Sequence, residues 1–210
     1  MSELFTAVVK GDIAGTIKEV NKCIAEGIAP KSILEEHLIP AMGEVGRLFD
    51  EDEYFVPDLM LSSNAMKEAM KILDPHLKQS GTAKRGTVLI GTVQGDMHDI
   101  GKNLVASMLE GNGFAVKDLG ISTSADKFIQ EIRKSEGESH LVLALSALLT
   151  TTMPQMKKLI DRLQTEGLRD SVKIMIGGAP VSEEYSREIG ADGYSDSAYS
   201  AVQLAIKLVS

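Results

Sequence analysis

One histidine, set among acidic residues and glycines, has the clearest chemical potential in this sequence. It lies in the stretch GDMHDIG (residues 95–101), directly after an apolar run that ends at Val93. Imidazole is a good ligand for transition metals, and a metal-bound histidine usually donates its second N–H to a carboxylate. Asp96 lies two residues before His98 and can turn back to accept that hydrogen. Gly101 would let the following helix begin close beneath a bulky ligand.

The same stretch allows a simpler interpretation, in which His98 is a solvated loop histidine and Asp99 is a helix N-cap. One histidine without further protein ligands does not make a zinc site. The single cysteine, Cys23, excludes an internal disulfide and any zinc site built on two thiolates. If His98 binds a metal, the remaining ligands must therefore come with a cofactor.

Later apolar runs are also followed by residues that could contact a ligand. The pair Gly177-Gly178 offers backbone without Cβ atoms, which a flat group can approach closely, but an ordinary turn needs the same residues. Ser146 alone is more simply a hydroxyl at a strand end. The three threonines 150–152 precede Pro154 and could be only a helix N-cap region.

The elements that must position these residues differ between the two halves of the chain. In the second half, short apolar runs of buried-strand type alternate with helical stretches, which predicts an open parallel sheet with helices on both faces. Such sheets bind ligands at the carboxyl ends of their strands. We expect strands at Thr87–Val93, Phe114–Leu119, Leu141–Ser146, Val172–Ile176 and near Gly193, and helices near Ile100–Glu110, Ala125–Lys134, Gln155–Gln164, Glu183–Ile189 and Ala198–Val209.

The first half has helical periodicity and predicts a bundle of about four helices. Pro40 should kink or restart one helix. The apolar spacing of the last helix runs through Leu77, and Asp74-Pro75 warns of its end. Residues 79–86 are polar, contain two glycines and show no periodicity, as a linker would. The predicted fold is thus an N-terminal four-helix bundle cap (1–78), a linker (79–86), and a flavodoxin- or Rossmann-like, doubly wound, five-stranded parallel sheet domain (87–210).

Composition excludes several classes of protein. The 210 residues are 43% apolar, enough to bury a core, and carry a net charge of −8, which argues against nucleic-acid binding. Aromatic residues are only 4%, which disfavours base stacking. No apolar run approaches the ~20 residues that span a bilayer, and the start has no signal-peptide pattern. We expect a cytoplasmic protein without membrane contact.

Taken together, the motifs resemble the cobalamin-binding signature of corrinoid proteins. The pattern Asp96-x-His98-x-x-Gly101 is followed after 44 residues by Ser146-x-Leu148, and after 28 more by Gly177-Gly178. Upstream, residues 42–49 (MGEVGRLF) and 54–57 (YFVP) are similar to the helical cap before the cobalamin domain of cobalamin-dependent methionine synthase. The same plan makes up the small corrinoid proteins of methyl-transfer systems.

The resemblance implies a role for each matching residue. His98 would be the lower ligand of cobalt, oriented by Asp96, with Thr152 completing the relay where the family usually has serine. The other expected cofactor contacts are Gly101, Ser146, Leu148, Thr150, Gly177 and Gly178, of which Ser146 would meet the detached lower base and the two glycines would line its slot. Phe49 and Val56 would cover the upper cobalt face, although bundle core is an equally good interpretation of both.

The resemblance also implies a function, that of a corrinoid methyl carrier. Co(I) would accept a methyl group through a substrate-specific methyltransferase, and methyl-Co(III), as in methylcobalamin, would pass it through a second methyltransferase to a folate or thiol. A reductive activator would repair Co(II). The cap should swing away on the linker when a partner docks. Alternatives are a cobalamin-dependent sensor or regulatory module, a subunit of a cobalamin isomerase, and a flavodoxin-like module without metal.

Overall fold

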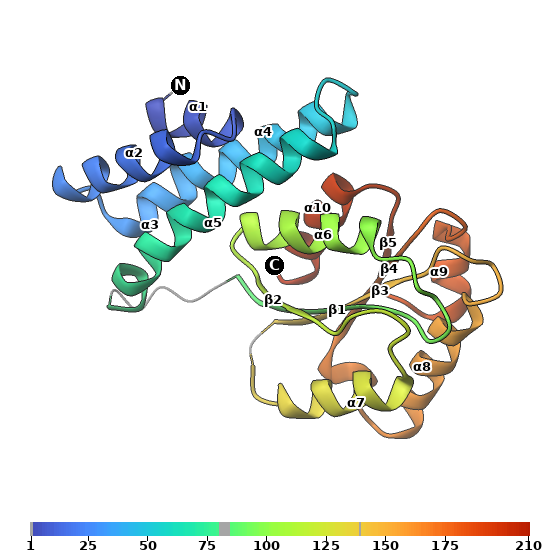
Figure 1. The fold of residues 1–210 in the computed structure, drawn as a ribbon. Coiled ribbons are helices and arrows are strands. Elements are labelled where there is room, and N and C mark those ends of the chain that lie inside the picture. The colour runs from blue at the N-terminus through green and yellow to red at the C-terminus, as the bar shows by residue number, and fades with distance from the viewer. Residues whose placement is uncertain (1, 80–84, 139) are drawn as a thin grey trace. The chain divides into compact units, whose positions relative to one another are not determined.

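The computed structural model describes residues 2–79, 85–138 and 140–210, and the chain falls into a helical unit and an α/β unit (Figure 1). The α/β unit begins at Arg85. Most of the predicted linker, residues 80–84, lies outside the described residues. No helix in the described ranges has the length and apolar character needed to cross a membrane.

The helical unit confirms the expected helical bundle and adds one helix that periodicity did not reveal. Its elements are α1 (Glu3–Val9), α2 (Ile13–Ala25), α3 (Pro30–Ser32), the π-helix η1 (Ile33–Leu38), α4 (Ile39–Asp50) and α5 (Val56–Gln79). The short α1 begins where the Ser2 hydroxyl accepts a hydrogen bond from the Phe5 N–H. Asp12 caps α2 by accepting a hydrogen bond from the Gly15 N–H at 2.9 Å.

Two of the four prolines in this unit, Pro40 and Pro75, lie where the sequence predicted a change in the helix. At Pro40 the helix changes type, because the π-helix η1 ends at Leu38, α4 begins at Ile39, and the Ile39 N–H reaches back five residues to the Leu34 carbonyl. Pro75 does not end the last helix, since α5 continues to Gln79. Leu73 and Leu77 are both buried, so helical geometry through Pro75 keeps two leucines in the core at the loss of one backbone hydrogen bond.

The α/β unit holds the predicted five-stranded parallel sheet, in the order β2-β1-β3-β4-β5. The strands are β1 (Thr87–Thr92), β2 (Ala115–Asp118), β3 (Leu141–Ser146), β4 (Lys173–Gly177) and β5 (Gly193–Ser195). The strand order reverses between β1 and β3, because the chain leaves β1 toward β2 and leaves β3 toward β4. Doubly wound sheets bind ligands at this switch point, where the loops after the two strands diverge.

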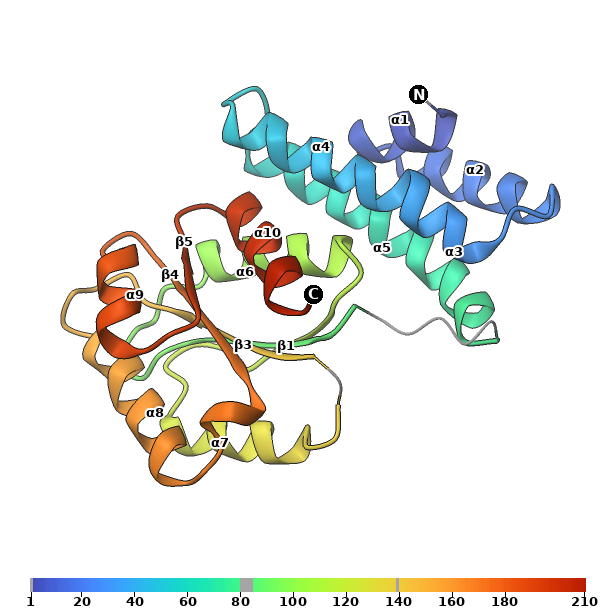
Figure 2. The same ribbon diagram turned by 180° about the vertical axis from the view of Figure 1, so that it is seen from behind.

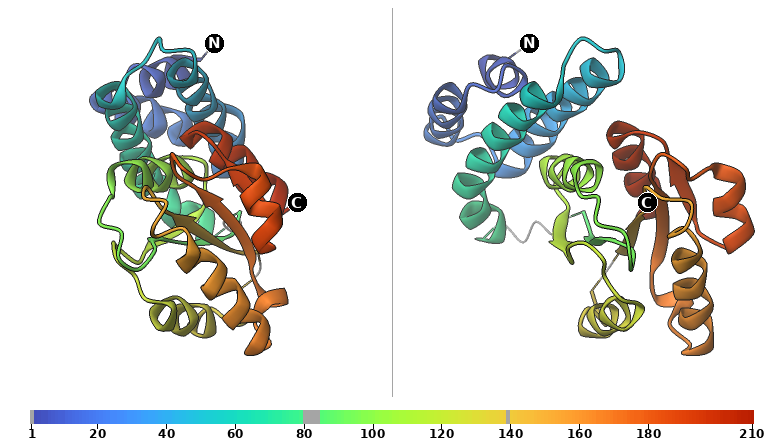
Figure 3. Two further views of the ribbon diagram at one scale, coloured as in Figure 1. Left: turned by 90° about the vertical axis from the view of Figure 1, so that its right-hand side faces the viewer. Right: turned by 45° about the vertical axis from the view of Figure 1, so that its right-hand side comes forward.

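Helices cover both faces of this sheet, as Figure 1, Figure 2 and Figure 3 show, with α6 and α10 on one side and α7 and α8 on the other. The helices are α6 (Ile100–Gly111), α7 (Ala125–Lys134), α8 (Pro154–Thr165), the 3-10 turn η2 (Arg169–Ser171), α9 (Glu183–Ile189) and α10 (Ala198–Leu208). The core on the second side joins residues of α7, α8 and α9 to β1, β3 and β4, and Phe128 is its largest fully buried side chain.

Substitution of Gly91 tests how closely the core side chains pack against β1. A Cβ at Gly91 would lie 2.8 Å from the ring of Phe128, which is only 1% exposed and cannot move aside. We expect Gly91→Ala to lower the free energy of unfolding by about 1–3 kcal/mol, measured by urea denaturation. Gly43→Ala in α4, where a Cβ would meet no atom within 4 Å, should instead be neutral or stabilising. Equal midpoints for both variants would contradict the packing.

Candidate functional site: the Asp96–His98 centre

The candidate site lies at the carboxyl edge of the sheet, where the loops after β1 and β3 meet. The last residues of four strands form one row in register, with Thr92 beside Ser146, Ser146 beside Gly177, and Gly177 beside Ser195. The Val93 N–H donates to the Ser146 carbonyl at 3.0 Å and carries the pairing just past the strand ends. The sheet thus brings together the Asp96 loop, the Ser146 loop and the two glycines that the sequence placed far apart.

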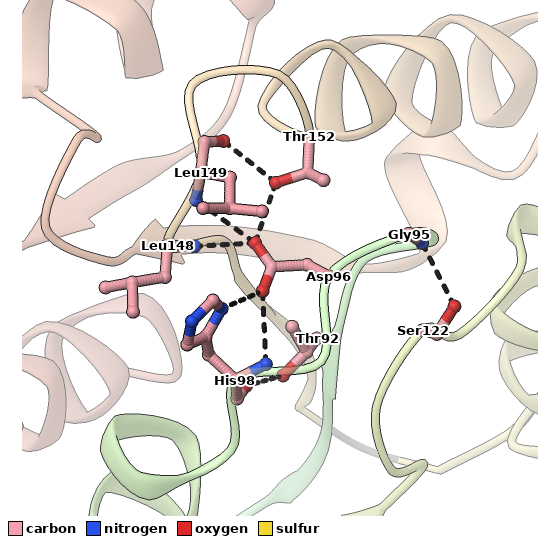
Figure 4. Close-up of polar contacts among 8 residues, drawn as sticks. All are labelled: Thr92, Gly95, Asp96, His98, Ser122, Leu148, Leu149 and Thr152. Carbon is pink, nitrogen blue, oxygen red and sulfur yellow. Dashed lines mark hydrogen bonds and ion pairs between the residues drawn. The ribbon is translucent and has the colours of Figure 1, made fainter.

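Asp96 is the centre of this arrangement and has no exposed surface (Figure 4). Its Oδ2 accepts hydrogen bonds from the Leu148 N–H at 2.8 Å, the Leu149 N–H at 3.2 Å and the Thr152 hydroxyl at 2.7 Å. Its Oδ1 accepts from the backbone N–H of His98 at 3.2 Å and lies 2.8 Å from Nδ1 of the same residue. One carboxylate therefore joins the loop after β1 to the loop after β3.

These donors keep the carboxylate ionised. Burial by itself would raise the pKa of Asp96, but the hydrogen bonds from the Thr152 hydroxyl and from His98 outweigh it and hold that pKa well below its ordinary value. The Thr152 hydroxyl also lies 2.8 Å from the Leu149 carbonyl. Its single hydrogen can serve only one acceptor, and the charged carboxylate is the stronger one. The Thr152 hydroxyl thus serves as a hydrogen-bond donor to Asp96.

The ionised carboxylate also decides the state of the His98 ring. An ionised Asp96 can only accept at this contact, so Nδ1 carries the hydrogen that lies between them, and Nε2 is the ring nitrogen left for another partner. The His98 side chain is half exposed, in contrast to its buried partner. A histidine that binds a metal through one ring nitrogen usually donates the N–H of the other to a carboxylate in this way.

The residues that the structure describes do not supply a complete metal site around this histidine. Within the described ranges, no group of three or more His, Cys, Asp or Glu side chains could hold a metal ion. A metal bound by Nε2 would have to bring its other ligands with it, as a metal held in a macrocycle does. The donor set of a single oriented imidazole therefore fits a cofactor that carries its own metal.

The surroundings of His98 fit a large cofactor with apolar surface. Large apolar side chains are exposed on the loops after β1, β2 and β3 and at the first residue of α6: Met97, Ile100, Ile121, Leu148 and Leu149. Met97 and Ile100, before and after His98 in the chain, are 64% and 74% exposed. Exposed large apolar side chains at the ligand-binding edge of such a sheet fit a ligand that covers them. At Gly101 a Cβ would meet no protein atom within 4 Å, so the space there is open to a ligand.

The two glycines at the end of β4, Gly177 and Gly178, lie so close to neighbouring backbone that a side chain would collide with it. Gly178 has φ +125°, and a Cβ there would lie 1.9 Å from the Ala147 carbonyl oxygen. At Gly177 a Cβ would lie 3.0 Å from the Ser195 carbonyl oxygen. Ser146 is half-buried beside Gly177, so these three predicted contacts lie together, while Thr150 lies on the exposed turn after β3.

Phe49 and Val56, the two residues expected to cover the cofactor, belong to the helical unit. Phe49 is half-buried near the end of α4, and Val56 is the first residue of α5 and 38% exposed. Their role above the metal stays a prediction. Sequence reasoning missed two neighbouring apolar residues, Phe55 and Met60, which are 65% and 56% exposed. Exposed apolar side chains beside a predicted lid could have been found only from the structure, because helical spacing alone does not tell core from surface.

Two further residues that sequence reasoning missed hold the His98 loop (Figure 4). The Ser122 hydroxyl accepts from the Gly95 N–H at 3.0 Å, and the Ser122 N–H donates to the Asp96 carbonyl at 2.9 Å. The Thr92 hydroxyl donates to the His98 carbonyl at 2.8 Å. Nothing in the local sequence marks either residue, because the contacts arise only when β1 and the loop after β2 are aligned.

The fold and the site define the class: a doubly wound sheet protein with one oriented histidine at the carboxyl edge of the sheet. The comparisons with known proteins identify the family and its cofactor. Family models described as "B12 binding domain" match residues 86–203 and residues 2–74, so the chain belongs to the B12-binding family and its cofactor is a corrinoid.

Similar proteins and solved structures align with nearly the whole chain. The chain is 41% identical over 210 residues to monomethylamine corrinoid protein 1 of Methanosarcina mazei, covering 99% of this chain and 96% of that protein. A cobalamin-binding protein from Desulfitobacterium hafniense has a similar structure, with TM-score 0.83, 32% identity, and coverage of 99% and 97%. A chain of the methanol:cobalamin methyltransferase complex of Methanosarcina barkeri aligns with TM-score 0.82 and 30% identity, over 99% of this chain and 78% of that one.

Removing the Thr152 hydroxyl should cost stability even without cofactor. Thr152→Val keeps the shape of the side chain but leaves the buried Asp96 carboxylate one donor short. We expect a loss of about 1.5–3 kcal/mol in the free energy of unfolding, measured by urea denaturation of the cofactor-free protein. Thr152→Ser retains the hydroxyl and should recover most of the loss. A valine variant as stable as the parent would show that this hydrogen bond does not stabilise the carboxylate.

Gly178 should tolerate alanine far worse than another glycine of positive φ. Gly178→Ala combines an unfavourable φ with a backbone collision at 1.9 Å, so we expect at least about 3 kcal/mol of destabilisation. Gly120 has φ +89° and no atom within 4 Å of a Cβ, so Gly120→Ala should cost only about 1–2 kcal/mol. Urea denaturation of both variants separates the cost of the collision with Ala147 from the cost of the unfavourable φ. Equal losses in the free energy of unfolding would show that the collision has no cost.

Proposed function

We propose that this chain is a methyl-carrying corrinoid protein that works between two methyltransferases. The proposal depends on one observation above the others: a buried, ionised Asp96 orients a half-exposed His98 in a chain of the B12-binding family. When bound, the corrinoid supplies a cobalt centre that can accept and donate a methyl group. The protein supplies orientation, protection from water and control of the lower ligand.

In this proposal His98 binds cobalt through Nε2, and Asp96 fixes the ring through Nδ1. The 2.8 Å contact between Nδ1 and Oδ1 keeps the hydrogen on the side away from the metal. Nε2 can hold either the metal or a proton, so ligation by His98 and protonation of His98 exclude one another. Thr152 and the backbone N–H groups of Leu148 and Leu149 keep Asp96 ionised in both situations.

The remaining predicted contacts follow from the same site. Gly101, Leu148 and Thr150 would lie against the corrinoid, Ser146 would contact its detached lower base, and Gly177 and Gly178 would line the slot for the nucleotide tail. The close approach of Gly178 to Ala147 places the backbone after β4 directly against the backbone after β3, next to Ser146. The exposed apolar side chains around His98 support a cofactor that covers them.

The helical unit would protect the opposite face of the cofactor. Its apolar side chains at the end of α4 and the start of α5, Phe49, Phe55, Val56 and Met60, are half-buried or exposed within the unit. An apolar cover would keep water from a reactive metal centre, and it would have to move aside before a partner could reach the methyl group.

The partners are a substrate-specific methyltransferase, a second methyltransferase for a folate or thiol acceptor, and a reductive activator. The relative in Methanosarcina mazei is named for monomethylamine, and the similar structure from Methanosarcina barkeri is a chain of a methanol methyltransferase complex. Proteins of one plan therefore serve different donors. We infer that the donor is recognised by the partner methyltransferase and not by this chain.

The carrier role can be tested by reconstitution. The protein, loaded with cobalamin and reduced, is incubated with a matched methyltransferase and methylamine, methanol, a betaine or a methoxylated aromatic, and methylation is followed by visible spectroscopy. We expect one donor to methylate the bound cofactor. Bound cobalamin that none of these donors methylates, together with cofactor-dependent oligomerisation, would replace the carrier role by that of a sensor.

His98 and Asp96 should differ in what their substitution does to the bound cofactor. His98→Ala should give a visible spectrum without the features of an axial imidazole, whereas His37→Ala, a half-buried histidine of the helical unit, should leave the spectrum unchanged. Asp96→Asn should weaken cobalamin binding by roughly 10–100-fold, the usual effect of losing a ligand's hydrogen-bond partner. An unchanged spectrum for His98→Ala would remove His98 from the metal.

A further inference from the structure

Thr92 makes a contact with the proposed metal ligand that the family motif does not contain. It is the last residue of β1, its side chain has no exposed surface, and its hydroxyl donates to the backbone carbonyl of His98 at 2.8 Å (Figure 4). The motif begins four residues later, at Asp96.

A hydroxyl at this place is informative because a strand core has no need of it. Valine has nearly the same shape as threonine and also suits a buried strand, whereas a buried hydroxyl is unfavourable unless it is hydrogen-bonded. The other side chains of β1 from Val88 to Ile90 are apolar and buried. The hydroxyl of Thr92 is therefore explained by its acceptor, the His98 carbonyl.

The position of this hydroxyl is set by the sheet and not by the loop that it holds. The Thr92 N–H donates to the Gly120 carbonyl at 3.0 Å, and the Thr92 carbonyl accepts from the Thr123 N–H at 2.9 Å. On its other side Thr92 pairs in register with Ser146 of β3. Thr92 is thus a fixed point from which the His98 loop can be held.

The contacts between Asp96 and His98 still allow His98 to tilt, and the hydrogen bond from Thr92 prevents that tilt. The backbone N–H and the ring Nδ1 of His98 both meet the same atom, Oδ1, at 3.2 and 2.8 Å. Two contacts that converge on one atom act as a pivot, about which the residue can still tilt. The hydrogen bond to the His98 carbonyl anchors the residue at a second point and fixes the tilt of the ring.

We propose that Thr92 is a positioning residue for the lower cobalt ligand: its hydroxyl sets the direction in which Nε2 of His98 points and so the strength of axial ligation. The inference rests on the proposed function, in which His98 binds cobalt. Loss of one hydrogen bond to a neutral carbonyl should shift the ratio of His-ligated to His-free cofactor by roughly three- to tenfold.

The test compares three variants loaded with cobalamin. Thr92→Val removes the hydroxyl and keeps the shape, and Thr92→Ser keeps the hydroxyl. Thr123→Val is the matched control, because Thr123 is also buried and its hydroxyl lies 3.1 and 3.3 Å from the Leu119 and Gly120 carbonyls and does not contact His98. Its contact with Thr92 is made by the backbone N–H, which valine keeps. The readouts are the visible spectrum of the methylated cofactor and the nitrogen splitting of the Co(II) electron paramagnetic resonance signal, which reports an axial imidazole directly.

We expect Thr92→Val to lower the His-ligated fraction, Thr92→Ser to restore it, and Thr123→Val to leave it unchanged even if the fold is less stable. Should Thr92→Val fail to fold, Thr92→Ala gives the same comparison. A His-ligated fraction in the hydroxyl-free variant equal to the parent's would overturn the proposal. His98→Ala, measured alongside, keeps the two proposals apart: if it does not change the nitrogen splitting, the proposed function itself fails.

Discussion

The site is organised around the fully buried carboxylate of Asp96. An ionised group without solvent contact is stable only if the protein replaces its lost hydration, and Asp96 obtains this from Leu148, Leu149, Thr152 and His98. Because three of these donors lie in the loop after β3 and one in the loop after β1, satisfying the charge also fixes the two loops against each other. The orientation of His98 follows from the same requirement.

The polar groups of the site therefore find their hydrogen-bond partners within the chain, whereas the apolar side chains near them remain exposed. The Asp96 carboxylate, the hydroxyls and the backbone N–H groups are hydrogen-bonded to one another, but the side chains of Met97, Ile100 and Leu148 are exposed. This division suits a cofactor site, because ordered polar groups reduce the entropy lost on binding while exposed apolar groups gain from being covered. The family match identifies the cofactor as a corrinoid.

The helical unit shows how far local rules are adjusted by packing. Pro40 breaks the regular hydrogen-bond pattern, and the chain responds with a π-helix over Ile33–Leu38 that keeps Ile33 and Leu38 fully buried. Pro75 likewise fails to end α5, because Leu77 beyond it belongs to the core. In both places the burial of leucine and isoleucine outweighs the single hydrogen bond that a proline removes.

The sequence by itself determined the order of helices and strands in the second half, the parallel sheet, and the candidates Asp96, His98, Ser146, Gly177 and Gly178. Those properties depend on apolar periodicity and on motif spacing, which can be observed in the linear sequence. Tertiary structure alone decided that α5 passes through Pro75, that Leu149 joins the donors to Asp96, and that Thr92 and Ser122 hold the His98 loop. Each of these depends on which residues the sheet register and the core bring into contact, and that alignment is fixed only when all the strands and helices pack at once.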